Sequence, residues 1–178
     1  MADSADFRLR LITRREADFD QLATVINAAF AIYPFMDGPR TSPEGVEEEL
    51  GDSGQFVVAD GTHGLAGCAM IRPCNDIDWG TEIETANPVH DADAMYLGLV
   101  GVDPPLRKHG LGRRLIAEAE RIARDRGFAS MALGTLAEMG NVVYYEALGY
   151  RAVGHRRWEP GHWGLTIPHE FYVMAKPL

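Results

Sequence analysis

The sequence predicts one α/β (α+β) domain in which strands and helices alternate, and three observations predict it. The chain has 178 residues, a length that suits one ordinary domain. Its contents of 46% hydrophobic and 24% charged residues are typical of globular proteins. Apolar side chains recur with the period of a strand in some segments and with the period of a helix in others. We therefore expect a single domain over residues 7–178, preceded by an N-terminal tail of residues 1–6.

The first part of the chain predicts a strand, two helices and a hairpin. Residues 7–12 begin with alternating apolar and polar side chains, the pattern of a half-buried strand. A helix of about three turns follows from Asp18, because apolar residues recur there at helical spacing. A second helix over 42–50 begins with Ser-Pro-Glu, which supplies an N-cap and a first-turn proline. Two β-like runs over 55–60 and 64–71 flank short turn material and predict a hairpin.

The second part predicts a buried strand followed by the strongest helix. Residues 72–93 show no clear period, and we expect a long loop there. Residues 95–102 are almost entirely apolar or glycine, which indicates a strand covered on both faces. The helix expected over 110–126 has one continuous apolar stripe and ends at a glycine. Shorter elements are expected farther on: a strand at 130–133, a helix at 141–148, and strands at 150–156 and 171–175.

Charge and cysteine content narrow the class of protein. The net charge of −9 and the sequence pI near 5.1 disfavour binding to nucleic acid through a basic surface. We see neither a signal-peptide pattern nor an apolar stretch long enough to span a membrane. Cys68 and Cys74 have no metal-type spacing and are interpreted as reduced thiols. We expect a cytoplasmic protein with no nucleic-acid or membrane partner.

A glycine-rich basic loop stands between the buried strand and the strong helix. Residues 107–114 read RKHGLGRR, which combines glycines, cations and a helix N-terminus. Free N–H groups in a first helical turn bind phosphate, and glycine lets the backbone approach an anion closely. The alternative interpretation is a glycine-rich cap followed by a solvated basic helix face. The loop does not match a P-loop, and it lacks the third glycine of a dinucleotide fingerprint.

Together with its flanks, this loop resembles the acetyl-CoA-binding signature of the GNAT superfamily of N-acetyltransferases. The family pattern is an apolar strand, V-x-P, and then [RQ]-x-x-G-x-[GA] at the start of a helix. Residues 144–150, YYEALGY, are similar to the family's Y-x-x-x-G-[FY] element. The resemblance implies a mixed, mostly antiparallel central sheet flanked by helices, with a splayed strand pair that holds CoA. The signature positions are filled by Val102, Pro104, Arg107, Gly110 and Gly112.

The resemblance also implies how acetyl-CoA is held as the acetyl donor. Val100 and Val102 would pair with the pantetheine arm, and an N–H near Leu99 or Val100, at a bulge, would polarise the thioester carbonyl. Amides of residues 107–112 would wrap the pyrophosphate, and Asn141 resembles a residue that contacts the pantetheine arm. Lys108, Arg113 or Arg114 would reach the 3′-phosphate. The expected cofactor-binding residues are Leu99, Val100, Val102, Arg107, Lys108, His109, Gly110, Leu111, Gly112, Arg113 and Asn141.

One catalytic residue is implied by the same resemblance. Tyr145 occupies the position of a tyrosine whose hydroxyl faces the CoA sulfur, and we expect it to act as general acid. The alternative for Tyr145 is a packed aromatic residue, and the alternative for Asn141 is a helix N-cap. Gly98 stands where many relatives carry a glutamate that serves as base. The alternative for each candidate base, a solvated loop residue, is the favoured one; the candidates, in the long loop and its approach to the strand, are Glu82, Glu84, His90, Asp91 and Asp93.

The C-terminal part contains histidines and tryptophans whose role is open. His155, His162 and His169 recur every seven residues, but the prolines and glycines between them prevent one helix from aligning them, and no metal is expected. Trp158 and Trp163, with His162, indicate either a loop over an acceptor cleft or a surface turn. Tyr33, Phe35 and Met36 fit either an acceptor pocket or the core.

The sequence therefore predicts an acetyl-CoA-dependent N-acetyltransferase. It would transfer the acetyl group directly to a primary amine of a small molecule or a peptide, without an acyl-enzyme, because neither cysteine has a histidine nearby in sequence. Gly98 motivates the alternative of a non-catalytic acyl-CoA-binding or regulatory module. A nucleotide-binding domain is a weaker third interpretation. The resemblance to the GNAT superfamily also implies a homodimer. The sequence does not identify the acceptor.

Overall fold

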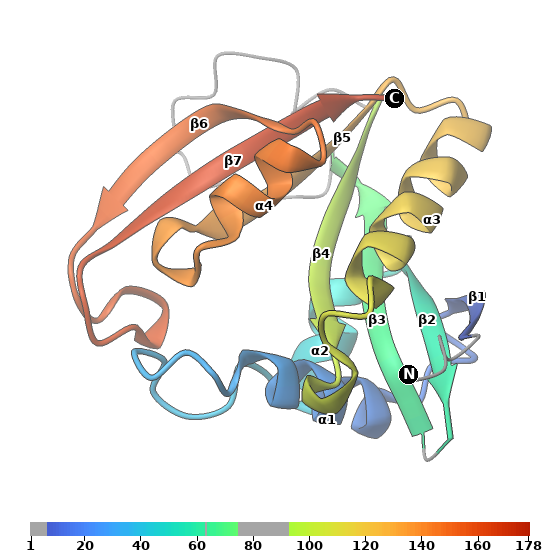
Figure 1. The fold of residues 1–178 in the computed structure, drawn as a ribbon, viewed down its shortest axis with the longest axis horizontal. Helices are drawn as coiled ribbons and strands as arrows, with labels where there is room; N and C mark the ends of the chain where they lie inside the picture. The colour runs from blue at the N-terminus through green and yellow to red at the C-terminus, as the bar shows by residue number, and fades with distance from the viewer. Residues whose placement is uncertain (1–6, 63, 75–92) are drawn as a thin grey trace. The chain divides into compact units, whose positions relative to one another are not determined.

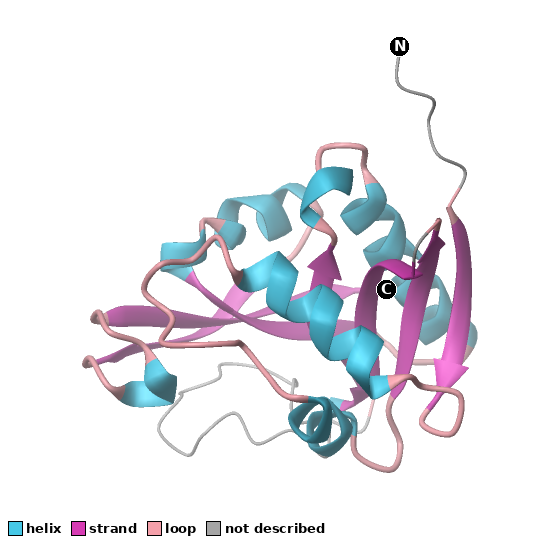
Figure 2. Ribbon diagram, turned by 90° about the horizontal axis from the view of Figure 1, so that it is seen from below, coloured by secondary structure: helices cyan, strands magenta, loops and turns pink. Residues whose placement is uncertain are grey.

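The computed structural model describes residues 7–62, 64–74 and 93–178, and they form strands and helices in the expected order (Figure 1). Figure 2 distinguishes the two kinds of element. No helix among these residues is long and apolar enough to cross a lipid bilayer. The strands are β1 (Arg8–Thr13), β2 (Gln55–Gly61), β3 (Gly64–Pro73), β4 (Ala94–Val102), β5 (Ser130–Leu136), β6 (Arg151–Trp158) and β7 (His169–Pro177). The helices are α1 (Phe19–Phe30), α2 (Pro43–Leu50), α3 (Leu111–Asp125) and α4 (Asn141–Ala147).

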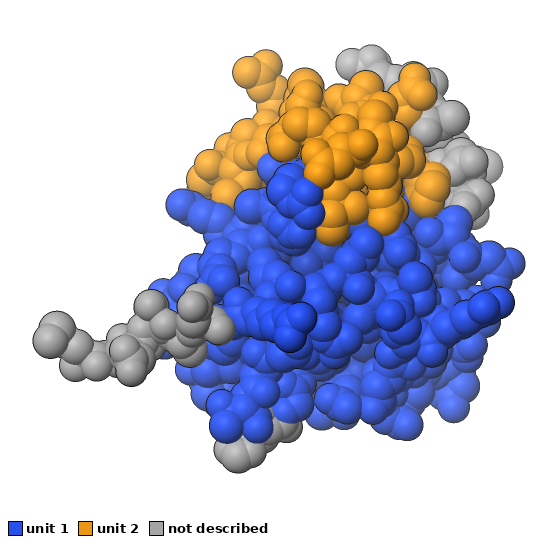
Figure 3. All heavy atoms as spheres, turned by 90° about the vertical axis from the view of Figure 1, so that its right-hand side faces the viewer, with its two compact units in different colours: residues 1–32, 39–72, 98–121 blue, residues 33–38, 73–97, 122–178 orange. Residues whose placement is uncertain are grey.

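The strands form a sheet in the order β1-β2-β3-β4-β5-β7-β6. The β1–β2, β2–β3, β5–β7 and β6–β7 pairs are antiparallel, and the β4–β5 pair is parallel. The chain divides into two compact units (Figure 3). The first unit comprises residues 1–32, 39–72 and 98–121, and the second comprises residues 33–38, 73–97 and 122–178. Strand β4 and helix α3 each begin in one unit and end in the other.

Local sequence signals set the two helices of the first unit. The Asp18 carboxylate accepts a hydrogen bond from the Gln21 N–H at 3.0 Å and caps α1. The Ser42 hydroxyl accepts one from the Gly45 N–H at 3.1 Å and caps α2, with Pro43 in the first turn. Both helices turn aliphatic side chains into the core, where Leu22, Ile26, Val46 and Leu50 are fully buried. The two predicted helices are confirmed, together with the predicted Ser42 cap.

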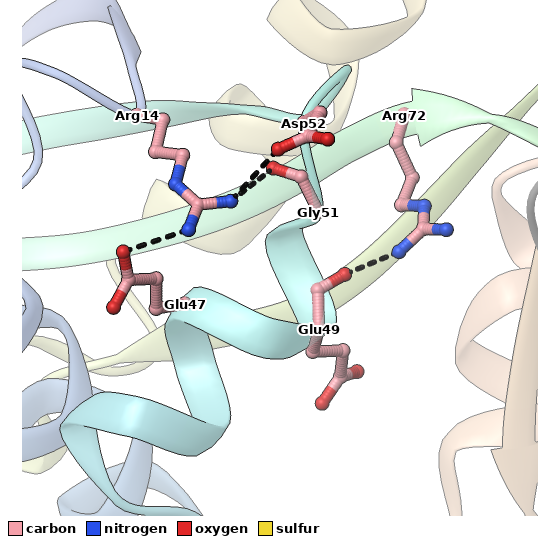
Figure 4. A network of polar contacts seen from close by, with 6 residues as sticks. All are labelled: Arg14, Glu47, Glu49, Gly51, Asp52 and Arg72. Atoms are coloured by element: carbon pink, nitrogen blue, oxygen red, sulfur yellow. Dashed lines mark hydrogen bonds and ion pairs between the residues drawn. The ribbon is translucent and has the colours of Figure 1, made fainter.

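Two arginines connect α2 to the sheet of this unit (Figure 4). The Arg14 guanidinium, just after β1, lies 2.8 Å from the Glu47 carboxylate and 3.2 Å from that of Asp52. Arg72, near the end of β3, donates to the Glu49 carbonyl at 2.6 Å. The Arg14 pairs are partly exposed and contribute about 1 kcal/mol or less each. Their effect is to fix the position of α2 rather than to add much stability.

Two glycines allow close packing around β4 in the first unit. A Cβ atom on Gly67 of β3 would lie 2.8 Å from the Gly101 carbonyl oxygen and 3.0 Å from a methyl group of Leu115. A Cβ atom on Gly101 would lie 3.3 Å from the Cβ of Ala29 and 3.4 Å from the Cα of Ile26. Backbone and helix therefore approach within distances that a side chain would prevent.

The second unit contains the first residues of β4 and, next to them in the sheet, strands β5, β7 and β6 in that order. Ala132 and Val173 lie in a buried cluster with Cys74 and Ala94, and Tyr96 and Phe171 are among the half-buried residues that pack against it. Residues Ala94, Met95 and Tyr96 of β4 pair with Ser130, Met131 and Ala132 of β5. The ladder ends there although β4 continues as a strand to Val102. This agrees with the expected divergence of the strand pair.

Element boundaries differ from the expected ones in a few places. Strand β5 ends at Leu136 instead of residue 133, because β7 continues to pair with it up to Phe171. The interpretation of Asn141 as an N-cap is wrong: Gly140 takes the cap position at φ 69°, and Asn141 is the first helical residue of α4. Of the long loop expected over 72–93, residues 75–92 lie outside the described residues.

We predict that Gly67→Ala destabilises the protein by about 1–3 kcal/mol, because the added methyl group would overlap the backbone of β4 and force the strands apart. Chemical denaturation measures this change. Thr62→Ala, an exposed substitution in the adjacent turn, is the control and should change the free energy of unfolding by less than about 0.5 kcal/mol. Equal stability of Gly67→Ala and the wild type would contradict the close packing described.

Candidate active site

The backbone of β4 is irregular at Leu99. Its φ of 44° lies in the left-handed region, which residues other than glycine rarely adopt, and its side chain is only 6% exposed. The carbonyl oxygen of Leu99 accepts a hydrogen bond from the Cys68 thiol at 3.5 Å. A left-handed residue inside a strand reorients the peptide groups on either side of it, as a bulge does. Leu99 is one of the two residues near which the family resemblance implies a bulge.

The Cys68 thiol is buried, and its burial disfavours the nucleophilic thiolate form. Burial raises the pKa of Cys68 to about 12, so the thiolate is scarce at neutral pH. Cys68 and Cys74 are both free and buried. Neither thiol is therefore set up as a nucleophile, in line with the expectation of direct transfer.

The loop after β4 turns the chain into α3. The Asp103 N–H donates to the Ala66 carbonyl at 2.9 Å, and a single 3₁₀ turn, η2 (Pro104–Leu106), follows. Lys108 and Gly110 then take left-handed φ values of 67° and 77°. A Cβ atom on Gly110 would meet no other atom within 4 Å, so the space beside this glycine is open. The first amides of α3, from Leu111 on, precede the first intrahelical bond, which Arg114 donates to Gly110.

Some cationic side chains of the loop hydrogen-bond to backbone carbonyls, and others are exposed. Arg107 donates its backbone N–H to Pro104 and its guanidinium to the Ala29 carbonyl at the end of α1. The Arg114 guanidinium donates to the Phe7 carbonyl at 2.9 Å. Lys108, His109 and Arg113 have exposed side chains. The Arg107 amide, one of those expected to wrap the pyrophosphate, has the Pro104 carbonyl as a partner within the loop.

Tyr145 lies on α4 in the second unit with its side chain 8% exposed. Its ring packs edge-on against Tyr150 and Tyr144, with centroids 5.7 and 5.4 Å apart. Burial, followed by the neighbouring phenols of Tyr144, Tyr96 and Tyr33, raises the pKa of Tyr145 well above the usual range for tyrosine. Among the described residues, no hydrogen-bond partner occupies its hydroxyl group. Tyr145 therefore holds its proton at all physiological pH values.

Only one of the five candidate bases, Asp93, lies among the described residues. Glu82, Glu84, His90 and Asp91 lie outside them. Asp93 is exposed, and its carbonyl oxygen accepts hydrogen bonds from the N–H groups of Ala129 and Ser130. Gly98 is buried in β4.

The histidines of the C-terminal hairpin separate into two environments. His155 lies 3.1 Å from the Glu170 carboxylate, to which the Tyr172 hydroxyl also donates at 3.2 Å. His162 instead stacks on Trp158, with ring centroids 3.9 Å apart. Among the described residues, no group of three acidic, histidine or cysteine side chains is placed to hold a metal ion. The regular spacing in sequence therefore does not bring the three histidines together.

The hairpin turn carries an aromatic cluster that the sequence only partly indicated. Trp163 packs against Phe171 with ring centroids 5.0 Å apart, and it lies 4.9 Å from His162 and 6.0 Å from the buried His169. Within the described part of the chain, Nε1 of Trp158 and Nε2 of His169 are buried without a hydrogen-bond partner, which costs about 1–3 kcal/mol for such a group. Phe171 belongs to this cluster, although the sequence pattern of its strand indicates only packing.

Comparison with known proteins identifies the family. A sequence model of the Acetyltransferase (GNAT) family matches residues 22–150. A search of curated proteins gave no match. Many solved structures share the fold. The ribosomal-protein-S18-alanine N-acetyltransferase from Escherichia coli is 20% identical with a TM-score of 0.69, covering 96% of this chain and 93% of that one.

Two further structures are similar over nearly their whole length. The ribosomal-protein-alanine N-acetyltransferase from Brucella melitensis is 20% identical, with a TM-score of 0.67 and coverage of 96% and 99%. An acetyltransferase of the GNAT family from Staphylococcus aureus is 15% identical, with a TM-score of 0.63 and the same coverage. The family match over most of the chain, together with the fold, shows that the protein belongs to the GNAT family of acetyltransferases and is an N-acetyltransferase.

Proposed function

We propose that the protein transfers the acetyl group of acetyl-CoA directly to a primary amine, using β4 and the start of α3 to hold the donor. The observation that carries this proposal is the left-handed Leu99 within β4, because a strained residue of this kind persists where the surrounding structure imposes it, and such residues cluster at functional sites. The family match supplies the class of reaction. Small-molecule and peptide amines are both within the proposal.

The loop before α3 has the features that a pyrophosphate requires. Open space beside Gly110 allows close approach, and the left-handed turn leads directly into the helix N-terminus. Amides at a helix N-terminus and its dipole favour negative charge. The residues proposed to bind phosphates through their amides are Lys108, His109, Gly110, Leu111 and Gly112, and the exposed side chains of Lys108 and Arg113 would reach the 3′-phosphate. The Arg107 guanidinium supports the loop by its hydrogen bond to the Ala29 carbonyl.

The strand before the loop provides the rest of the donor site. The β4–β5 ladder ends at Tyr96, and Val100 and Val102 come after it, both half-buried. Their backbone groups are proposed to pair with the amides of the pantetheine arm, as an added strand would. Turned by the left-handed conformation, an N–H at Leu99 or Val100 would donate to the thioester oxygen and stabilise the negative charge that develops on it. Asn141, at the first turn of α4, would contact the same arm.

The chemical step requires a neutral amine and a proton for the leaving sulfur. The amine nitrogen forms a bond to the acetyl carbon, the carbon–sulfur bond breaks, and the sulfur leaves with the bonding electrons. Tyr145 is proposed to donate its hydroxyl proton to that sulfur. Its raised pKa suits an acid and not a base, because the phenol remains protonated at the pH of the reaction. The amine gives up its own proton to water or to an acceptor in the loop before β4.

We further propose a cytoplasmic, reducing setting for this reaction. Both cysteines are free and buried, as is usual where thiols stay reduced. A homodimer is compatible with the proposal, and neither nucleic acid nor a membrane has a role in it.

We expect Gly112→Asp to weaken binding of CoA and acetyl-CoA by tenfold or more, because a carboxylate would face the pyrophosphate at the helix N-terminus. The free protein should keep its stability, since an acidic residue in a first helical turn is favourable. Thermal unfolding with and without ligand measures both effects; a ligand at 100 times its dissociation constant stabilises by about 2.7 kcal/mol. Ala117→Asp, exposed one turn later on α3, is the charge-matched control. Unchanged CoA binding in Gly112→Asp would place the donor elsewhere.

Tyr145→Phe should lower kcat by about 100-fold and leave the KM for acetyl-CoA within about twofold, because the ring remains and only the acidic proton is lost. Tyr144→Phe, which alters the half-exposed neighbour, should retain kcat. In the wild type, kcat should not fall between pH 7 and pH 9 through ionisation of Tyr145, since its pKa is raised. Full activity of Tyr145→Phe would exclude it as the acid. CoA binding without turnover of any amine would instead support a non-catalytic acyl-CoA-binding module.

Cys68→Ala should retain acetyl transfer within about threefold, and mass spectrometry of the wild type mixed with acetyl-CoA alone should show no acetylated cysteine. The reason is the pKa of Cys68, raised to about 12, which leaves almost no thiolate at neutral pH. Cys74→Ala serves as the matched control, since that thiol is buried as well. An acetyl group trapped on Cys68 would contradict direct transfer.

A further inference from the structure

The direction of the Tyr145 phenol, the proposed general acid, is set by the packing of its ring. In the described part of the chain, no hydrogen-bond partner holds its hydroxyl group. The ring makes edge-on contacts with Tyr144 and Tyr150, with centroids 5.4 and 5.7 Å apart. Aromatic pairs favour this T-shaped arrangement at centroid distances of about 4.5–7 Å. The orientation of the acid therefore depends on how firmly these two neighbouring rings are themselves held.

The two neighbouring rings differ in how firmly they are held. Tyr144 is 39% exposed, so solvent covers part of its side chain. Tyr150 is only 1% exposed and is among the largest fully buried side chains of the described residues. Buried side chains are closely packed and keep one low-energy rotamer, whereas an exposed side chain changes rotamer readily. Tyr150 is therefore the contact that can hold the Tyr145 ring in one orientation.

The end of α4 places Tyr150 against Tyr145 through a known backbone motif. Gly149 has a left-handed φ of 94° and ends the helix. The Tyr150 N–H donates to the Tyr145 carbonyl at 3.1 Å, and the Gly149 N–H donates to the Glu146 carbonyl at 2.9 Å. These two bonds define a Schellman motif, in which an apolar contact often joins the residue after the glycine to the helical residue five positions earlier. The same helix end therefore fixes both rings.

Strand β7 also holds Tyr150. The Lys176 ammonium group lies 5.6 Å from the centroid of the Tyr150 ring, a distance at which a cation is attracted to an aromatic face. A Cβ atom on Gly149 would lie 3.5 Å from Cε of Lys176, so the lysine stem packs against this glycine. Tyr150 is thus held by the sheet as well as by the helix that carries Tyr145.

Proton transfer is sensitive to the position of the acid. A general acid must come within hydrogen-bond reach of the atom that it protonates. A misplacement of about 1 Å can reduce a rate by about 100-fold. The hydroxyl of Tyr145 lies at the far end of its ring, so a change in ring orientation displaces it more than any other atom of the side chain. Loss of the Tyr150 ring should therefore affect the chemical step.

We propose that Tyr150 is a positioning residue for acetyl transfer, whose ring holds the Tyr145 ring so that the hydroxyl meets the leaving sulfur. The proton comes from Tyr145, and Tyr150 acts only through that residue. This inference rests on the proposed function, in which Tyr145 is the acid.

Tyr150→Met tests the inference, because it removes the ring and fills its place with a flexible apolar side chain. The initial rate of CoA release, with saturating acetyl-CoA and a fixed high concentration of n-butylamine, gives an apparent kcat. We expect this kcat to fall by tenfold or more, with the KM for acetyl-CoA within about twofold of the wild type. Tyr150→Phe keeps the ring and should retain kcat within about threefold. An unchanged kcat in Tyr150→Met would overturn the proposal.

A double-mutant cycle separates positioning of the acid from a general structural effect. Tyr145→Phe has already lost the acidic proton, so adding Tyr150→Met should lower its kcat by less than about twofold. A further tenfold loss in the double variant would show that Tyr150 does not act through Tyr145, and would contradict the proposal. Full kcat in Tyr145→Phe alone would exclude that residue as the acid. CoA release by the wild type no faster than without protein would contradict acetyl transfer itself.

Tyr172→Met is the matched control on β7. The Tyr172 ring is half-buried and lies 4.6 Å from the His155 ring, so this variant also removes a packed tyrosine ring and should keep kcat within about twofold. Thermal unfolding of each variant establishes that it is folded at the assay temperature. If Tyr150→Met does not fold, Tyr150→Phe is still decisive: a tenfold loss of kcat in this folded variant would assign the effect to the hydroxyl and overturn positioning by the ring.

Discussion

The conformation of β4 is the constraint on which the rest of the structure depends. Three residues of the strand pair with β5, and Leu99, three residues after the last pair, turns left-handed while its side chain stays buried. Such a residue costs about 1–3 kcal/mol and persists only where its surroundings impose it. At the end of the strand the Asp103 N–H is bonded to the Ala66 carbonyl, and the 3.5 Å contact from the Cys68 thiol, a weak donor, adds little to this. Gly67 and Gly101 permit the close contacts that hold the strand in place.

The order of elements could be predicted from the sequence because the signals for it are local. Alternation, helical periodicity, the Asp18 and Ser42 caps and the glycine-rich start of α3 each lie within a few residues of the structure they specify. Features that depend on distant partners could not be predicted. Strand β5 runs to Leu136 because β7 pairs with it from about 35 residues away, and Arg107 and Arg114 find carbonyl partners 78 and 107 residues earlier in the chain.

The features of the candidate site differ in the same way: some could be predicted from local sequence, and others required the structure. The proposal that the loop binds an anion follows from its glycines and cations next to a helix start, and the sequence also indicated the family. The separation of Lys108 and Arg113 from the engaged Arg107 and Arg114 required the structure, since all four side chains look alike in sequence. The residues that share a face of the β6–β7 hairpin could not be identified from the sequence for a related reason: only the register shows that Arg156 pairs with Phe171 and Trp158 with His169.

The most direct test of the proposed donor site is a titration of isotopically labelled protein with CoA, followed by the backbone amide signals in NMR spectra. Binding at β4 and the α3 N-terminus predicts the largest shifts at residues 99–102 and 108–113, with small changes in the amides of β1 and β2. Saturable binding whose largest shifts fall in β1, β2 or α2, with residues 99–113 unaffected, would contradict the assignment of the donor to this strand and loop.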